Sequence, residues 1–428
     1  RAPHRRGIAC PLPSNLLMLR STVSSARRCR VSAAAPIRLA AVAANESTRA
    51  MSVVAPVKNT SQMQSLGIDV PLPIVEKFDP PYRLLAGPGP GNAHPRVHAA
   101  MTLPQVGHLD PYFLNLMEQI KSLMRYTYQT NNDFTVPVSG TGSAAMEACV
   151  ANMIEPGDKF LVGVNGYFGK RLVDMASRYG AQCIEINRPW GQVFTYEEIK
   201  AAVEKHQPRV MALVHAETST GACQPFDGVG ELCRKHGVIL IADTVTSISG
   251  VPLYVDKWGI DAVYAGTQKA LSCPPGVSPM SFSPAAMDKL LKRKTAVPNW
   301  YLDMKMVASY LTQTGGGARS YHHTAPISMC FALREALQLV SEEGLETRWA
   351  RHREVAEEFW RLLGEMGLEP LVDHKNRLPT LTTIRVPAGI DPKAVTNFIL
   401  AKYNIEIGNG LGELAGKCWR VGLMGYNA

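Results

Sequence analysis

Short apolar runs that alternate with helical segments constrain the fold of this chain more than any other feature. The runs are expected strands over residues 159–164, 181–186, 209–216 and 237–244, and amphipathic helices are expected over 169–180, 196–206 and 228–236. Strands without polar alternation are buried on both faces, and their alternation with helices gives a parallel sheet covered on both sides. The sequence therefore predicts an α/β fold.

The length of 428 residues is sufficient for more than one domain. Prolines in residues 51–81 predict an irregular N-terminal arm, and residues 82–342 would form the large domain. Residues 343–428 predict a smaller α+β domain, with strands in 377–387 and 417–423 and a helix over 391–403. No apolar run approaches the roughly 18–20 residues that a membrane span requires, so we expect no membrane partner.

The positive charge is concentrated at the N-terminus. Residues 1–50 contain nine Arg and one acid, Glu46, and so contribute +8 of the net charge of +9. The remaining chain is close to neutral, so no nucleic-acid partner is predicted. Residues 1–50 are also rich in Ser and Ala, which predicts a mitochondrial transit peptide, with a chloroplast or peroxisome as alternative destinations. A disordered basic tail without a targeting role is the alternative interpretation.

The nine cysteines are spread singly from Cys10 to Cys418, without a CxxC pair and without histidines at metal-ligand spacing. This pattern predicts reduced, mostly buried thiols, and neither a disulfide framework nor a metal site.

Ligands of parallel α/β sheets bind beyond the carboxyl ends of the strands, so the residues after each run are candidates. A Gly-rich turn in residues 138–148, "VSGTGSAAMEA", opens a helix. Its backbone N–H groups and the hydroxyls of Thr141 and Ser143 suit a phosphate. Phe168, after the strand 159–164, can either pack in the core or lie over a planar ring.

An acid and a lysine follow the next two strands. Asp243 comes directly after "VILIA", and Lys269 follows the expected buried strand 261–266. A loop cap for Asp243 and a solvated position for Lys269 are the structural alternatives. Together with the phosphate turn and the aromatic ring, they match pyridoxal phosphate, which needs a Schiff-base lysine, a carboxylate at the pyridinium nitrogen and an anchored phosphate.

The same turn also resembles a dinucleotide fingerprint, Gly140-x-Gly142-x-x-Ala145, which would indicate a nicotinamide-dependent oxidoreductase. Two features disfavour this alternative. Pro137 interrupts the preceding strand, and no strand-terminal acid follows about 20 residues later, since Asp158 belongs to the turn "EPGD".

Seven segments of the chain resemble one family over residues 82 to 428. They are "LLAGPGPGNAHPRV", "SGTGSAAMEA", "EPGDKFLVGVNGYFGKR", "HAETSTG", "IADTVTSISGVPLYVDKWGIDAVYAGTQKALSCPPG", "YHHTAPI" and "WRVGLMG". The family is that of the alanine–glyoxylate (serine–pyruvate) aminotransferases, class V enzymes of the fold-type I pyridoxal-phosphate group. The resemblance implies a mostly parallel seven-stranded sheet, a homodimer with shared active sites, and small amino acids and 2-oxo acids as substrates.

The resemblance also implies a role for each matching residue. Lys269 would carry the cofactor, Asp243 would pair with its ring nitrogen, and Val245 and Phe168 would pack against its ring. The remaining cofactor contacts would be Thr141, Gly142, Ser143 and Gln268 at the phosphate, Thr218 near the ring hydroxyl, and Tyr321 and Thr324 at the phosphate of the neighbouring subunit. Arg420 would bind the substrate carboxylate, with Gly89 beside it.

The implied reaction is ping-pong transamination of glyoxylate to glycine, as in photorespiration, with alanine or serine as amino donor. Phe168 and Ser143 replace the Trp and His of the animal enzymes, and "GHLDPYF" (107–113) is closer to plant and bacterial relatives. Two other classes share the fold. A cysteine desulfurase would need a nucleophilic Cys, but Cys330 lies in an expected helix. A non-enzymatic binding protein would be expected to lose Lys269 or Asp243.

Overall fold

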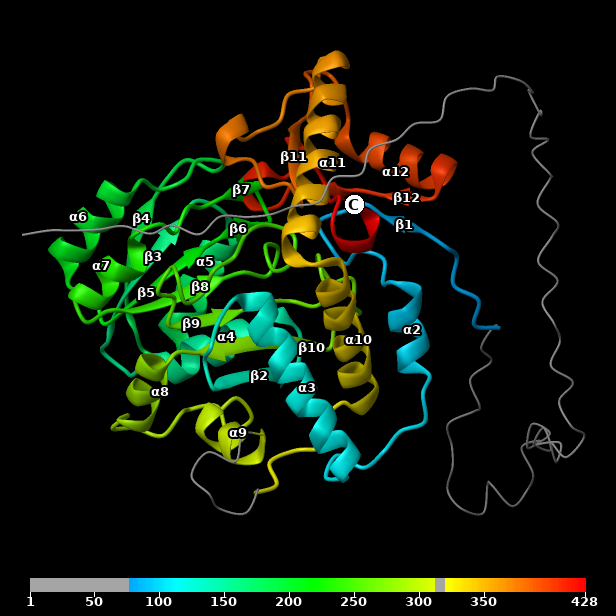
Figure 1. Cartoon of the computed structure of the whole chain (residues 1–428). Coiled ribbons are helices and arrows are strands. Elements are labelled where there is room, and N and C mark those ends of the chain that lie inside the picture. The colour runs from blue at the N-terminus through cyan, green and yellow to red at the C-terminus, as the bar shows by residue number, and fades with distance from the viewer. Residues whose placement is uncertain (1–76, 312–319) are drawn as a thin grey trace, which may run out of the picture. The chain divides into compact units, whose positions relative to one another are not determined.

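The computed structural model describes residues 77–311 and 320–428 (Figure 1). The chain divides after Phe78, and Asp79–Ala428 forms one compact unit. The expected transit peptide and residues 51–76 of the expected arm lie outside the described residues.

A seven-stranded sheet forms the centre of this unit (Figure 1). Its strands, in spatial order, are β2 (Phe134–Ser139), β10 (Val277–Phe282), β9 (Ala262–Tyr264), β8 (Ile239–Asp243), β5 (Val210–Val214), β3 (Lys159–Val164) and β4 (Gln182–Asn187). Within this sheet, β10 runs antiparallel to both neighbours and the other neighbouring pairs are parallel. The predicted α/β fold with a mostly parallel sheet is confirmed.

Helices cover both faces of the sheet. α4 (Gly142–Met153) contacts α5 (Tyr167–Arg178), and α6 (Tyr196–His206) contacts α7 (Val229–Lys235). The connections through α4 and α5 run toward β4 along the sheet, and those through α6 and α7 run back. Because such crossovers are right-handed, the two helix pairs lie on opposite faces. This double cover explains why every residue of β5 is buried.

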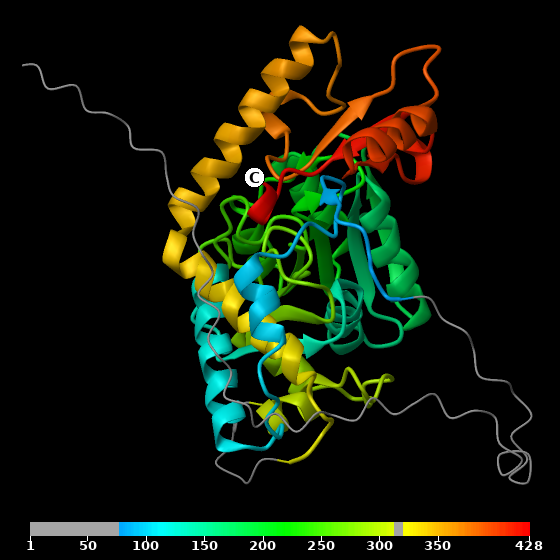
Figure 2. The same ribbon diagram turned by 90° about the vertical axis from the view of Figure 1, so that its right-hand side faces the viewer.

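Three further helices pack side by side, as Figures 1 and 2 show: α10 (Ile327–Glu343) contacts both α2 (Pro95–Met101) and α3 (Pro111–Tyr128). α3 begins where Asp110 accepts a hydrogen bond from the Tyr112 N–H at 2.7 Å, with Pro111 in the first turn. Its apolar residues recur at helical spacing and are buried: Phe113, Met117, Ile120 and Met124. In chain order, α8 (Pro284–Leu291) and α9 (Met304–Leu311) come after β10, the last strand of this sheet.

The C-terminal part has its own small sheet, β11 (Thr382–Arg385), β14 (Cys418–Val421) and β13 (Gly408–Asn409), with helices α11 (Leu345–Glu365) and α12 (Pro392–Tyr403). Trp360, Ile384 and Trp419 belong to an apolar cluster separate from the main core. The remaining short elements are β1 (Leu84–Leu85) paired with β12 (Ile405–Glu406), β6 (Ala216–Glu217) paired with β7 (Ala222–Cys223), and 3₁₀ turns at His374–Asn376, Gly412–Leu414 and Gly425–Asn427. The domain boundary at residue 343 stays a prediction.

The structure adds detail to two predictions from the sequence, the extent of the strand 209–216 and the position of Pro137. The expected strand 209–216 ends at Val214: the His215 N–H donates the last hydrogen bond of the β5–β8 ladder to the Asp243 carbonyl, and Ala216 starts the separate pair β6–β7. Pro137 does lie within a strand, but that strand, β2, is at the edge of the sheet, where a missing N–H is tolerated.

In the described ranges, no helix is both long and apolar enough to cross a bilayer. The seven cysteines of the same ranges are all free thiols, and five of them are buried.

Candidate active site

The carboxyl ends of β8 and β9 bring an acid and a lysine to one edge of the sheet. Asp243, the last residue of β8, lies opposite Tyr264, the last residue of β9, and Lys269 follows five residues later. The two groups are close enough to influence each other: the charge of Asp243 raises the pKa of Lys269, and the charge of Lys269 lowers the pKa of Asp243. The two candidates of the sequence therefore share one site.

Asp243 is 2 % exposed and accepts two hydrogen bonds. Its Oδ1 accepts from the Val245 N–H at 2.9 Å, and its Oδ2 accepts from the Tyr264 hydroxyl at 2.8 Å. Burial raises the pKa of Asp243 to about 6, against the lowering effect of these donors and of Arg171 and Lys269. The Val245 bond is the structural cap considered from the sequence, but a loop cap does not require so buried a carboxylate.

Lys269 is buried, at 7 % exposure, so the solvated-loop alternative is wrong. Its Nζ donates a hydrogen bond to the Pro88 carbonyl. Gly89 lies against the side chain: a Cβ at this position would stand 2.6 Å from Nζ, and its φ of +106° favours glycine. Burial, together with the charge of Arg420, lowers the pKa of Lys269 to about 8, while Asp243 raises it. An amine with this pKa is partly uncharged near neutral pH and is a competent nucleophile.

The first turn of α4 forms an anion site beside these residues. Thr141 is the N-cap of α4, yet its side chain makes no capping hydrogen bond. Gly142 lies next to Gly266 and Val245, since an added Cβ would be in van der Waals contact with both at 3.4 Å. The Gln268 Oε1 is buried without a hydrogen-bond partner. A phosphate at this helix end would meet backbone N–H groups and the Thr141 hydroxyl, and a turned Gln268 amide would donate to it.

Phe168, at the start of α5, borders the site. The Arg171 guanidinium lies 4.6 Å from the centre of the Phe168 ring and donates to the Ser143 hydroxyl at 3.2 Å. Arg171 was not among the residues predicted from the sequence. Its signal was its position three residues after Phe168, which places both side chains on one helix face.

Glu217, a second residue that was not predicted from the sequence, is the last residue of β6 and is fully buried. Its carboxylate accepts from the Phe168 N–H at 3.1 Å, and from the N–H and hydroxyl of Ser219 at 3.0 Å and 2.6 Å. Burial raises the pKa of Glu217 to about 7. The neighbouring Thr218 hydroxyl bonds the Thr246 hydroxyl. An acid next to Thr218 after an apolar run was the available signal.

Arg420 reaches this edge from β14 of the small sheet. Its Nε donates to the Asn409 carbonyl at 2.9 Å and its Nη1 to the Thr218 carbonyl at 3.3 Å. These bonds use two of the five N–H donors of a guanidinium, so the others can bind a carboxylate. Burial lowers the pKa of Arg420, and Glu217 raises it.

Tyr321 and Thr324 are exposed, and their hydroxyls lie 3.4 Å apart. The ring of Tyr321 contacts His108. The structure therefore keeps these two residues together on the surface, and their contact with a neighbouring subunit stays a prediction.

The residues present fit pyridoxal phosphate. The buried carboxylate of Asp243 suits a cationic ring nitrogen, the Lys269 amine suits an aldehyde, and the unpartnered Gln268 Oε1 lies beside a helix end suited to a phosphate. Cys330, by contrast, is 1 % exposed within α10, and burial raises its pKa to about 12, which does not fit a nucleophilic thiol. In residues 77–311 and 320–428, no cluster of His, Cys, Asp or Glu could hold a metal ion.

Comparisons with known proteins agree with the resemblance seen in the sequence. Residues 95–427 match the family model of class V aminotransferases. The chain is 42% identical over 373 residues to the alanine–glyoxylate aminotransferase of Rattus norvegicus, covering 87% of this chain and 90% of the relative. The solved alanine–glyoxylate aminotransferase of Nostoc sp. superposes with a TM-score of 0.81 at 56% identity, covering 83% of this chain and 93% of that one. The ureidoglycine–glyoxylate aminotransferase of Bacillus subtilis superposes with a TM-score of 0.80 at 38% identity, covering 82% and 90%.

Proposed function

The chain belongs to the class V aminotransferase family, and from this membership and its own site we propose that it transfers the amino group of alanine to glyoxylate. The observation that carries the proposal is the convergence of Lys269, Asp243 and Arg420: the charges of a buried carboxylate and a half-buried guanidinium both act on a buried amine. An amine, an acid and a carboxylate-binding group are the minimum set for amino-group transfer between α-amino and 2-oxo acids.

Each of these residues has a separate task. Pyridoxal phosphate, the cofactor of the family, supplies an electron sink for the electron pair left when the α-proton departs. Arg420 binds the α-carboxylate, which donor and acceptor have in common, so one product leaves before the next substrate enters. Lys269 Nζ takes the α-proton and returns it, and general acid–base help of this kind is typically worth about 10²–10⁴-fold. Asp243, ionised above its pKa of about 6, would pair with the ring nitrogen of the cofactor and favour its protonated form.

Glyoxylate has broader support as acceptor than alanine has as donor. The relatives of Rattus norvegicus and Bacillus subtilis both carry glyoxylate in their names, while their named donors are alanine and ureidoglycine. Serine remains the alternative donor proposed from the sequence. In a dinucleotide-binding fold, the strand before the Gly-rich turn lies inside the sheet, where the strand order reverses. Here that strand, β2, lies at the edge of the sheet, so the nicotinamide-dependent alternative loses support.

We further propose a homodimer in which Tyr321 and Thr324 contribute to the neighbouring site, and their exposure is compatible with this role. The Arg-rich residues 1–50 support delivery to a mitochondrion, and a role in photorespiration would follow from glyoxylate as substrate.

The proposal is tested by incubating the purified chain and pyridoxal phosphate with glyoxylate and either alanine or serine. Formation of glycine with an equal amount of pyruvate is expected from alanine, and hydroxypyruvate would identify serine as donor. Absence of glycine from both mixtures would contradict the proposal, and consumption of glyoxylate in a third mixture, which contains a reduced nicotinamide cofactor and no amino donor, would favour the oxidoreductase alternative.

A further inference from the structure

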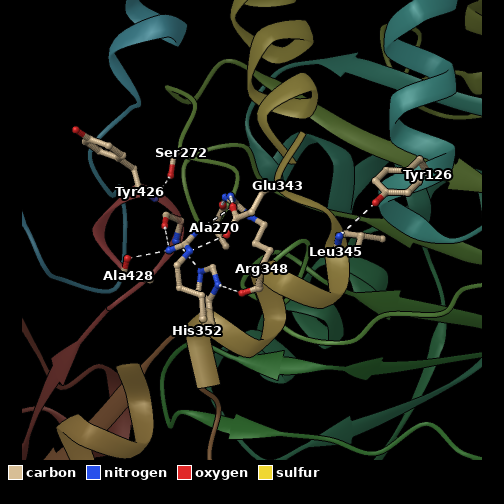
Figure 3. Close-up of polar contacts among 11 residues, drawn as sticks. Tyr126, Ala270, Ser272, Glu343, Leu345, Arg348, His352, Tyr426 and Ala428 are labelled. Carbon is tan, nitrogen blue, oxygen red and sulfur yellow. Dashed lines mark hydrogen bonds and ion pairs between the residues drawn. The ribbon is translucent and has the colours of Figure 1, made fainter. Parts of the chain in front are cut away.

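Helix α11 contacts two segments that flank the active site, and Figure 3 shows this junction. Arg348, Arg351 and His352 are spaced three and four residues apart, so they share one face of the helix. One segment is 270–272, directly after Lys269. The other is 424–428, just after the strand that carries Arg420.

Arg348 binds the first segment. It is 5 % exposed, its Nη2 donates to the Ala270 carbonyl at 2.6 Å, and its Nη1 pairs with Glu343 at 2.6 Å. Ala270 follows Lys269 directly, and the Ser272 N–H closes the turn by donating to the Lys269 carbonyl at 2.9 Å. Arg348 is thus one residue away from the amine-bearing residue without touching the amine.

His352 and Arg351 bind the second segment. The His352 Nδ1–H donates to the Arg348 carbonyl at 2.7 Å, so its Nε2 accepts from the Gly425 N–H at 2.8 Å. Arg351 donates to the Gly425 carbonyl at 3.0 Å. Burial lowers the pKa of His352 to about 4, which agrees with the neutral ring that these two bonds require.

The two segments also meet directly. The Tyr426 N–H donates to the Ser272 hydroxyl at 2.6 Å (Figure 3). Gly425 packs against this contact: an added Cβ would stand 2.0 Å from the Ser272 Oγ and 2.8 Å from the Ala270 carbonyl oxygen. One helix face therefore holds both the turn after Lys269 and the segment after β14.

We propose that Arg348 is a positioning residue for Lys269, which it holds through the Ala270 carbonyl at a fixed place relative to Arg420. The inference rests on the proposed function for the roles of Lys269 and Arg420. Arg420 has its own bonds to Asn409 and Thr218, so the loss of Arg348 would displace the amine more than the carboxylate anchor. A small displacement of a reacting group slows the chemical step more than it weakens binding.

Kinetics of the holoenzyme give the first test. Arg348→Met should lower kcat with alanine and glyoxylate by about 10- to 100-fold, with KM for both substrates little changed. Arg348→Lys should recover part of kcat, because a lysine can reach either Ala270 or Glu343 but lacks the forked geometry to bind both. A rise in KM alone, or a wild-type kcat, would overturn the proposal.

A second readout does not depend on turnover. After removal of the cofactor, the full chain is acetylated over a range of pH and the extent at Lys269 is measured by mass spectrometry. The wild-type midpoint is expected near 8. In Arg348→Met it should move toward the ordinary lysine value of about 10.4, because a loosened turn exposes the amine to water. Arg351→Met is the comparison variant: it also loses a pair with Glu343, together with its bonds to Gly425 and Ala428, but makes no contact with Ala270, so its midpoint should shift less than that of Arg348→Met.

An unchanged midpoint in Arg348→Met, or an equal shift in Arg351→Met, would overturn the proposal. If Arg348→Met does not fold, Arg348→Lys decides between the outcomes: wild-type kcat and midpoint would overturn the proposal, and intermediate values would support it. A wild-type chain without transaminase activity would refute the proposed function only, because the acetylation comparison still tests the positioning of Lys269.

Discussion

The Tyr264 hydroxyl donates to Asp243 Oδ2 at 2.8 Å across the ends of two neighbouring parallel strands. Asp243 must be ionised to hold a cationic ring nitrogen, so the affinity of the cofactor-free chain for pyridoxal phosphate should fall as the pH drops through its pKa of about 6. Tyr264→Phe removes a donor that lowers this pKa. Since a hydrogen bond to a charged group is worth about 1.5–3 kcal/mol, the acid limb of cofactor affinity, measured by equilibrium titration over a range of pH, should move up by roughly 1–2 pH units.

The matched control is Tyr128→Phe, because Tyr128 is equally buried but donates to the Pro279 carbonyl. It should lose stability without a shift of the acid limb. Equal profiles for Tyr264→Phe and the wild type would show that Asp243 does not set the acid limb.

Asp243 should destabilise the chain that it makes active. Its pKa is raised from 3.8 to about 6, so the charged form is disfavoured in the folded state. The resulting loss in the free energy of unfolding is absent below pH about 4, grows as the pH rises to about 6, and then stays at roughly 3 kcal/mol. Asp243→Asn should therefore raise the melting temperature of the cofactor-free chain at pH 8 and abolish turnover. An unchanged or lower melting temperature at pH 8 would contradict this cost.

Gly89 and Gly91 form a matched pair in the segment "GPGPG". In Gly89→Ala the new methyl group would lie 2.6 Å from Lys269 Nζ, in a backbone conformation of φ +106° that side chains rarely adopt. In Gly91→Ala the nearest atom lies 3.7 Å away. We expect Gly89→Ala to lose cofactor binding, measured by equilibrium titration of pyridoxal phosphate, and Gly91→Ala to retain it. Equal affinities would show that Gly89 does not constrain Lys269.

Arg420→Gln should raise KM for both substrates in steady-state kinetics, because both lose the carboxylate anchor. Loss of hydrogen bonds to a charged group costs about 1.5–3 kcal/mol, which corresponds to roughly 10- to 150-fold. Arg385→Gln, in the adjacent strand β11 with an exposed side chain, should leave KM unchanged. A rise confined to one substrate would mean that donor and acceptor bind at different carboxylate sites.

Local sequence signals predicted much of the fold. The expected strand 159–164 and helix 196–206 coincide with β3 and α6, since continuous burial and helical spacing leave a direct trace in the sequence. The break after Val214 was missed, because Ala216 was counted with the apolar run before it, although it already belongs to β6, which pairs with β7. β6 and β7 form a local hairpin across residues 218–221, so the available signal was Gly221 in that turn, whose φ is +75°.

The candidate site likewise contains residues that could be predicted from the sequence and residues that could not. Asp243 and Lys269 could be placed on one edge because each follows a buried strand. Arg171 and Glu217 could not be placed there with the same certainty, because their roles depend on contacts with other elements. Arg171 contacts Ser143 of α4, and Glu217 contacts Phe168 of α5. Arg348 lies 79 residues after Lys269, and only the folded chain shows that it binds the next residue, Ala270.

The central claim is that Lys269 carries the cofactor covalently. The holoenzyme is reduced with borohydride, which converts a lysine–pyridoxal linkage into a stable amine, and is then digested and analysed by mass spectrometry. We expect the peptide that contains "AGTQKALSCPPG" to carry the mass increase of one pyridoxyl phosphate group, located at Lys269. The same mass on another lysine, or an unmodified Lys269 in an active preparation, would contradict it.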